Sequence, residues 1–273
     1  MRASTTTACL RASSGPNVRS MRHSGARATR RILIVTSCTG EKSVEHKRAL
    51  RLADFRRGPE HIARRERELA GTLTPAEDLY SGQQHVRLMR GVRALRESQA
   101  FTVDLWILSA GYGLVRARRK LASYEATFHG MKSAELRRWA DALNVPADVR
   151  RVLASEYHIA LVLLGDEYLK ACAFGADVQL GGLTLLFCGV NTAKRLPRMP
   201  NLRPVVLSTP EATRFSCGLV GLKGEVGSRL LTKLKETPSL SAGLRDPATD
   251  VLGLLDGKED RQPKLQGREC RVT

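Results

Sequence analysis

The sequence predicts an α/β protein with an open, mostly parallel sheet of about five strands, helices on both faces and a helical hairpin at the C-terminal end. Three short apolar runs, at 32–36, 105–108 and 160–164, are typical of strands that are buried on both faces. Stretches with the helical spacing of apolar residues separate these runs. The chain has 273 residues, 42% of them hydrophobic, which is enough to form one sizeable core.

The expected strands leave room for a helix between most neighbours, and this alternation of strands and helices is typical of a parallel sheet. We expect the strands at 31–36, 104–108, 158–164, 183–188 and 203–207.

Several segments between the strands have helical patterns. Residues 41–70 are charged and largely helical, with a break at Gly58-Pro59. Apolar residues repeat at helical spacing from the Ser81-Gly82 helix start to about Arg96. A further amphipathic helix is expected at 133–143, capped by its first serine, and Pro146 opens the next one.

Composition divides the chain into four parts. We expect a disordered basic extension at 1–30 and an α/β domain of catalytic type at 31–208. A basic helical hairpin at 209–235 would follow, with its turn in the glycine-rich stretch 218–227. The last part, 236–273, is punctuated by proline and glycine and is expected to be mobile.

The net charge of +18 indicates a polyanionic partner, because cationic surfaces bind nucleic acid by releasing its counterions. Residues 1–31 contain seven arginines and no acidic residue, and residues 194–235 contain nine basic and two acidic residues. Charge alone does not separate DNA from RNA or a ribosomal surface. As phosphate-binding candidates we take Arg116, Arg118, Arg119, Lys194, Arg195, Lys223, Arg229 and Lys233.

The six cysteines are dispersed, without the spacing of a zinc site or a disulfide framework, which favours a reducing cytoplasm. No His, Asp or Glu grouping has metal-ligand spacing, so we expect no metal. No apolar stretch approaches the ~20 residues that span a bilayer, so we expect no membrane partner. No obligate protein partner is evident either.

Three loops that follow strands are expected to share one pocket, because open α/β sheets bind ligands outside the carboxyl ends of their strands. These loops are 37–42, 109–113 and 165–168. Hydroxyl and amide groups of the first loop would bind an anion or cap the next helix. The substrate-binding candidates are Ser37, Cys38, Thr39, Lys42, Ser109, Gly111, Tyr112, Gly113 and Tyr124.

Three of these candidates have competing interpretations. Tyr112 and Tyr124 would stack on an unpaired base, or would pack at the strand ends. Cys38 would be a nucleophile or, more simply, a packed thiol. The glycines of the second loop lack the third glycine of a dinucleotide fingerprint, so nicotinamide binding gains no support.

The acidic candidate for catalysis is Asp78, together with Tyr80 and Ser81. A carboxylate beside a sugar would stabilise positive charge at the anomeric carbon or orient a water molecule. The alternative is that Asp78 only caps a helix. Glu125 and the Asp166-Glu167 pair are weaker candidates, which fit a loop contact or the first turn of a helix.

Four segments carry a family resemblance: ILIVTSCTGEK at 32–42, DLYSG at 78–82, LWILSAGYGLV at 105–115 and YEATF at 124–128. They resemble an uncharacterised bacterial and phage family that is grouped near the peroxide-stress protein YaaA. Members resemble the uracil-DNA-glycosylase type of α/β fold. One lineage is similar to anti-phage DNA glycosylases that remove glucosylated hydroxymethylcytosine.

The resemblance implies cleavage of the N-glycosidic bond of a modified, phage-derived base in DNA, leaving an abasic site and using no cofactor. A non-catalytic DNA-binding stress protein is the first alternative, and a nucleotide-processing transferase is the second. The G-Q-D-P-Y and H-P-S signatures of uracil-DNA glycosylases are absent, so their catalytic aspartate and histidine have no counterparts here. The matching positions are Ser37, Cys38, Asp78, Tyr80, Ser81, Ser109, Gly111, Gly113 and Tyr124.

Overall fold

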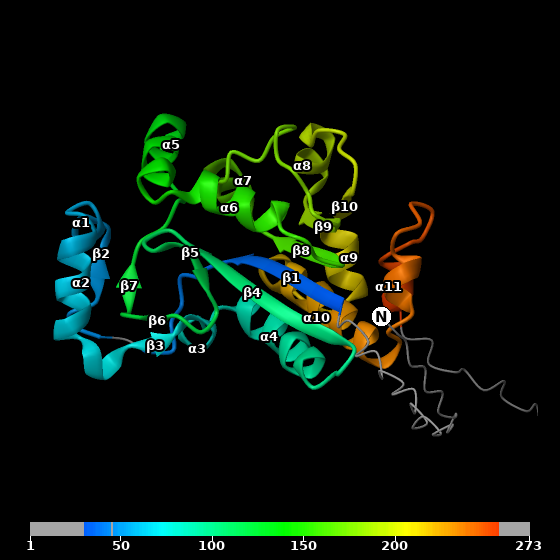
Figure 1. Cartoon of the computed structure of the whole chain (residues 1–273), viewed down its shortest axis with the longest axis horizontal. Coiled ribbons are helices and arrows are strands. Elements are labelled where there is room, and N and C mark those ends of the chain that lie inside the picture. The colour runs from blue at the N-terminus through cyan, green and yellow to red at the C-terminus, as the bar shows by residue number, and fades with distance from the viewer. Residues whose placement is uncertain (1–29, 45, 257–273) are drawn as a thin grey trace, which may run out of the picture.

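The computed structural model describes residues 30–44 and 46–256, which form a six-stranded sheet with helices on both faces (Figure 1). The strand order is β10-β9-β8-β1-β4-β5, and all neighbouring pairs are parallel except β4 and β5. The strands are β1 (Arg30–Ser37), β4 (Phe101–Ser109), β5 (Gly113–Arg116), β8 (Ile159–Leu163), β9 (Leu183–Cys188) and β10 (Leu202–Val206).

The predicted α/β class and all five predicted parallel strands are confirmed. The sixth strand, β5, is not among the predicted strands. It turns back from β4 through a three-residue connection, so that Gly113 pairs with Ser109. Gly113 has φ +68°, a conformation that side chains other than glycine rarely adopt, and this allows the tight reversal.

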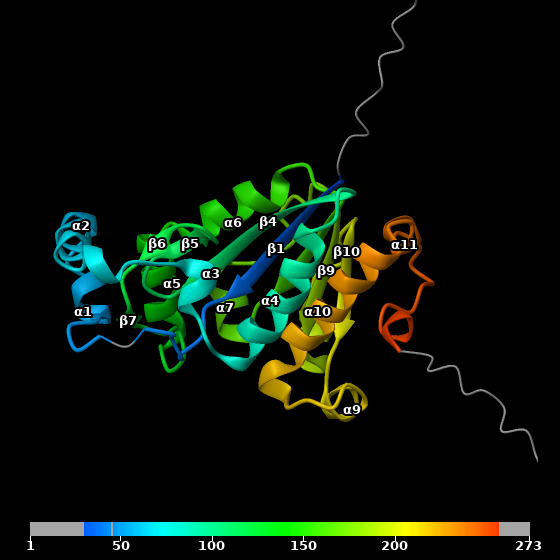
Figure 2. The same cartoon turned by 90° about the horizontal axis from the view of Figure 1, so that it is seen from below.

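Helices cover both faces of the sheet, as the continuous apolar strands predicted (Figure 2). Alternate residues of β1 divide between the two cores: Leu33 and Val35 contribute to one, and Ile32 and Ile34 to the other. The first core lies beneath α5 (Ser133–Ala142), α6 (Val145–Ala154), α7 (Asp166–Ala171) and α8 (Val190–Arg195). The second lies beneath α4 (Gln83–Arg96), α9 (Thr209–Arg214) and α10 (Leu219–Glu236).

The glycine-rich stretch that was expected to form a hairpin turn lies inside the 18-residue helix α10. Helix α10 lies beside α4 (Figure 2), and Gly221 and Gly224 face α4 and let the two helix backbones approach closely. A methyl group on Gly224 would overlap the carbonyl oxygen of Gln84, and one on Gly91 of α4 would lie 2.5 Å from the Ser228 Cα atom. The predicted hairpin is therefore replaced by the short helix α9 and a long packed helix.

Residues 237–256 fold back against the β10 side of the molecule, which differs from the mobile tail expected there. They contain α11 (Leu240–Gly243) and the 3-10 turn η2 (Gly253–Leu255), and they bury Leu244. The Arg203 guanidinium on β10 donates to the carbonyl oxygens of Leu244 and Asp246 at 3.2 and 3.0 Å. The rest of the expected tail, and nearly all of the expected N-terminal extension, lie outside the described residues.

An arm between β1 and α4 packs beyond β5, at the left of Figure 1. Two short strand pairs connect it to the rest of the molecule: β2 with β7, and β3 with β6. The arm therefore places the loop after β1 beside the segment that leads to α5. The elements of the arm are β2 (Leu50–Arg51), α1 (Leu52–Phe55), α2 (Pro59–Glu68), η1 (Ala70–Thr72), β3 (Thr74–Pro75) and α3 (Ala76–Leu79), and their partner strands are β6 (Lys120–Leu121) and β7 (Tyr124–Glu125).

Candidate functional site

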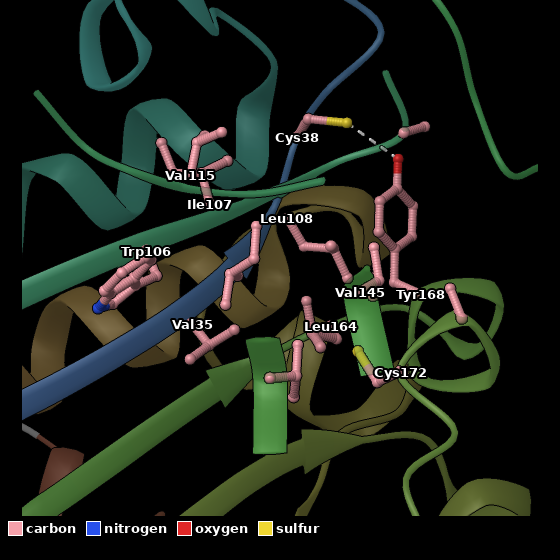
Figure 3. Close-up of a cluster of buried hydrophobic side chains, with 14 of the residues drawn as sticks. Val35, Cys38, Trp106, Ile107, Leu108, Val115, Val145, Leu164, Tyr168 and Cys172 are labelled. Atoms are coloured by element: carbon pink, nitrogen blue, oxygen red, sulfur yellow. Dashed lines mark hydrogen bonds between the residues drawn. The ribbon is translucent and has the colours of Figure 1, made fainter. Parts of the chain in front are cut away.

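The loops after β1, β4 and β8 meet at the carboxyl edge of the sheet, as predicted, because these three strands are neighbours. The Cys38 amide donates to the Leu108 carbonyl oxygen at 2.9 Å. The Cys38 Sγ atom lies 3.1 Å from the Tyr168 hydroxyl, which links the first loop to the third (Figure 3). Cys38 is only 7% exposed, which agrees with the packed-thiol interpretation.

A buried chain of hydroxyl groups connects the second loop to Tyr80 and Tyr124. Ser109 Oγ donates to the Tyr124 hydroxyl at 2.7 Å, and the Tyr124 and Tyr80 hydroxyls lie 2.9 Å apart. Burial raises the pKa of both tyrosines, so they are neutral hydrogen-bonding groups. Tyr124 is fully buried, so its ring packs within the protein and offers no face to a base.

Neighbouring segments cover the two glycines that were expected to approach a substrate: the arm covers Gly111, and the end of α5 covers Gly113. Phe55 lies so close to Gly111 that a methyl group there would come within 2.6 Å of its ring. The Phe55 ring also makes an edge contact with half-buried Tyr112, with ring centroids 4.9 Å apart. A methyl group on Gly113 would likewise lie 2.8 Å from the carbonyl oxygen of Leu143. Both glycines serve packing in this structure.

The polar groups of the first loop mostly bind to α4. The Gln84 Nε2 atom donates to Thr36 Oγ1, Ser37 Oγ and the Leu163 carbonyl oxygen at 3.0–3.3 Å. Thr39 Oγ1 accepts the Gly82 amide at 3.1 Å. These contacts attach the first loop to the start of α4, so these polar groups have partners within the protein. Ser81 is half-buried, and its amide donates to the Glu41 carbonyl oxygen at 3.2 Å.

Lys42 and Glu125 face open space at this edge. They line a central hollow of about 530 Å³, together with Gly40 and His129, and also an outer hollow of about 650 Å³ beside His46. Burial lowers the pKa of Lys42, against the opposing effects of Cys38 and Glu125. The Lys42 Nζ atom donates to the Gly40 carbonyl oxygen at 3.0 Å. It lies 4.5 Å above the centre of the Tyr124 ring.

Asp78, the favoured acidic candidate, lies outside both hollows. Its side chain is 54% exposed and lies 3.9 Å from the Arg93 guanidinium on α4. Two carboxylates line the central hollow, those of Glu125 and Glu135, and Glu125 is the one that the sequence ranked as a weaker candidate. Its position directly after Tyr124, within a segment that carries the family resemblance, was the available signal.

The predicted phosphate-binding residues do not form one track. Arg116 is the last residue of β5, at one edge of the sheet, and its guanidinium carbon lies 4.8 Å from the centre of the Trp106 ring. Arg119 lies over the Tyr112 ring at 5.4 Å. Lys194 and Arg195 are the last two residues of α8. This helix connects β9 to β10 at the opposite edge of the sheet. The two groups are therefore separated by the full width of the sheet (Figure 1).

The basic residues of α10 mostly have partners within the protein. Lys223 is half-buried and donates to the Leu164 carbonyl oxygen, and burial lowers the pKa of Lys223. Arg229 Nε donates to the Glu225 carboxylate at 2.9 Å. Lys233 lies 3.9 Å from the Glu236 carboxylate, and both side chains are exposed. Because each of these cations has a partner within the protein, its attraction for a phosphate is weaker.

The comparisons with known proteins give a family without an assigned activity. Residues 67–197 match the model of a family of unknown function, DUF6884. This match includes Tyr80, Ser109 and Glu125, and it begins after Lys42. No curated protein matches the chain. The resemblance to YaaA and to uracil-DNA glycosylases therefore stays a prediction.

Among residues 30–44 and 46–256, no group of three or more His, Cys, Asp or Glu side chains is arranged to hold a metal ion. No helix in the same part of the chain has the length and apolarity needed to cross a membrane.

Proposed function

We propose that the protein is an N-glycosidase that releases a modified base from DNA and leaves an abasic site. The supporting observation is that Lys42 and Glu125 line the same hollow. Cleavage of a C1′–N bond develops positive charge on the sugar and negative charge on the departing base. Fixed charges of opposite sign would stabilise both ends of that transition state.

Each side chain has a distinct role in the proposed reaction. The Glu125 carboxylate stabilises the cationic sugar and accepts a proton from the attacking water. The water oxygen bonds to C1′ as the C1′–N bond breaks, and the base leaves with the bonding electron pair. The Lys42 ammonium donates a proton to the base nitrogen, and a lowered pKa favours that transfer near neutral pH.

The location of the hollow supports a substrate nucleotide that has left the base stack. Lys42 is half-buried beside the Tyr124 ring, so the reacting sugar must approach the recess closely. Enzymes that act on a base inside a duplex extrude it or act on single strands. The resemblance favours glucosylated hydroxymethylcytosine of phage DNA as the base and anti-phage defence as the role. We place this activity in the cytoplasm, which the free thiols of Cys172 and Cys188 favour.

The test is base release from phage-modified and unmodified DNA, followed by alkali cleavage of abasic sites and mass analysis of the released base. We expect Glu125→Gln to reduce release at least ~100-fold, the effect of losing a general base, while DNA affinity stays unchanged. Asp78→Asn is the matched control and should retain release. Loss of release in Asp78→Asn with retention in Glu125→Gln would reverse the assignment.

A second candidate is a non-catalytic DNA-binding protein, which the net charge of +18 favours. In that case every modified DNA should shift in a gel while its strands remain intact after alkali. Glu125→Gln would then change neither result.

A further inference from the structure

A third hollow, which neither the sequence nor the proposed reaction accounts for, opens beside α5. It has a volume of about 470 Å³ and is lined by Arg56, Lys132, Glu135, Arg138 and the edge of Trp139. The Trp139 indole donates to the Ala110 carbonyl oxygen at 2.8 Å, which fixes the floor of this α5 hollow to the second loop.

The three hollows adjoin one another. The central and outer hollows share Gly40, Lys42 and Glu125, and the central and α5 hollows share Glu135. The three hollows therefore lie in a row along the boundary between the arm and α5, and we refer to this row as the groove. The reacting pair proposed above occupies the middle of this groove.

Basic side chains line both ends of the groove, and Glu125 lies between them. In the outer hollow Lys42 and Lys47 accompany the carboxylates of Glu41 and Glu125. Lys132 and Arg138 line the α5 hollow, are exposed, and form no ion pair with any described residue. No side chain from the described part of the chain caps the first turn of α5, which begins beside Lys132, so its amides add positive potential.

We propose that this groove binds single-stranded DNA, with backbone phosphates at Lys132 and Arg138 in the α5 hollow and at Lys47 in the outer hollow. The inference rests on the proposed nucleic-acid substrate and specifies its form and path. Three adjoining recesses suit successive unstacked nucleotides, and the central recess holds the nucleotide next to Lys42 and Glu125.

One ion pair in the groove predicts a substitution that strengthens DNA binding instead of weakening it. The Arg56 guanidinium lies 2.6 Å from the Glu135 carboxylate, and both side chains are about half exposed. A phosphate in the α5 hollow must compete with Glu135 for Arg56. Neutralising Glu135 should therefore strengthen DNA binding, whereas removing the cations weakens it.

The experiment measures fluorescence anisotropy of a short labelled oligothymidylate over a series of salt concentrations. Lys132→Ala/Arg138→Ala should bind at least ~10-fold more weakly at low salt. It should also reduce the slope of log affinity against log salt by about 1.4, because each phosphate contact on a single strand contributes about 0.7. Glu135→Gln should bind more tightly than the wild type. Arg67→Ala/Arg198→Ala removes the same charge at two exposed positions outside the groove and should keep the wild-type slope.

The outcomes separate this proposal from the proposed reaction. Equal losses of DNA affinity in the two double variants would overturn the proposal that the groove binds DNA, even if base release is intact. An unchanged salt slope of the affinity in Lys132→Ala/Arg138→Ala would overturn it as well. Tighter binding of duplex DNA or oligouridylate than of oligothymidylate would overturn the assignment to single-stranded DNA. Groove-dependent binding without base release from any modified DNA would instead refute the N-glycosidase and leave the groove standing. Matching melting temperatures confirm that the variants fold.

Discussion

Ser109 Oγ donates to the Tyr124 hydroxyl at 2.7 Å and also accepts the amides of Gly111 and Tyr112 at 3.1 and 2.9 Å. One side chain therefore connects the end of β4, the turn into β5 and the buried tyrosines. Because these groups are shielded from water, each lost partner leaves a buried polar atom unsatisfied.

Truncating this network should destabilise the protein in a non-additive way. Tyr124→Phe should lower the free energy of unfolding by about 1–3 kcal/mol, and Ser109→Ala by at least as much. The double variant should lose less than the sum, with a coupling energy of about 0.5 kcal/mol or more. Urea denaturation measures all four proteins, with exposed Ser133→Ala as a control near wild-type stability. Strict additivity would contradict the shared hydrogen bond.

Gly224→Ala should destabilise the protein by about 1–3 kcal/mol, the usual cost of overpacking, because its methyl group would overlap the Gln84 carbonyl oxygen across the α4–α10 interface. The control is Gly218→Ala, where no atom lies within 4 Å of the new methyl group and φ is −71°. Thermal unfolding followed by circular dichroism measures the difference. Equal melting temperatures for the two variants would mean that the helices do not pack this closely.

Lys42→Met should change the pH dependence of stability. Burial lowers the pKa of Lys42 in the folded state, so between that value and 10.5 the unfolded chain binds more protons than the folded one. The wild type should therefore gain stability relative to Lys42→Met as the pH rises from neutrality through 10.5. Urea denaturation at a series of pH values measures this gain. Lys47 is exposed, so the stability of Lys47→Met should change with pH as the stability of the wild type does. If the wild type gained as much stability relative to Lys47→Met as relative to Lys42→Met, the burial of Lys42 would be refuted.

The sequence predicted the sheet well because its signals are local. Ile32, Leu105 and Leu161 belong to apolar runs that are long enough for a strand and too short for a helix, and each run ends in a polar or glycine-rich loop. Glycine was the less reliable signal, because the same residue permits a turn or a close approach. Gly113 enters a reversal, whereas Gly224 packs one helix against another.

The candidate site was predicted in part. Lys42, Ser109 and Tyr124 meet at the expected edge because the carboxyl ends of adjacent parallel strands must adjoin. The sequence favoured Asp78 over Glu125, although both lie in segments that carry the same family resemblance. Only the packing of the short helix α3 against α4 directs Asp78 toward Arg93.

The sequence by itself determined the α/β class, the five parallel strands and the edge at which their loops gather, because burial of apolar residues is encoded over a few neighbouring positions. The tertiary structure alone decided which charged groups share a hollow. Arg56 and Glu135 are 79 residues apart and meet only because the arm docks beside α5. Contacts at such separation depend on the docking of whole elements, which no local pattern specifies.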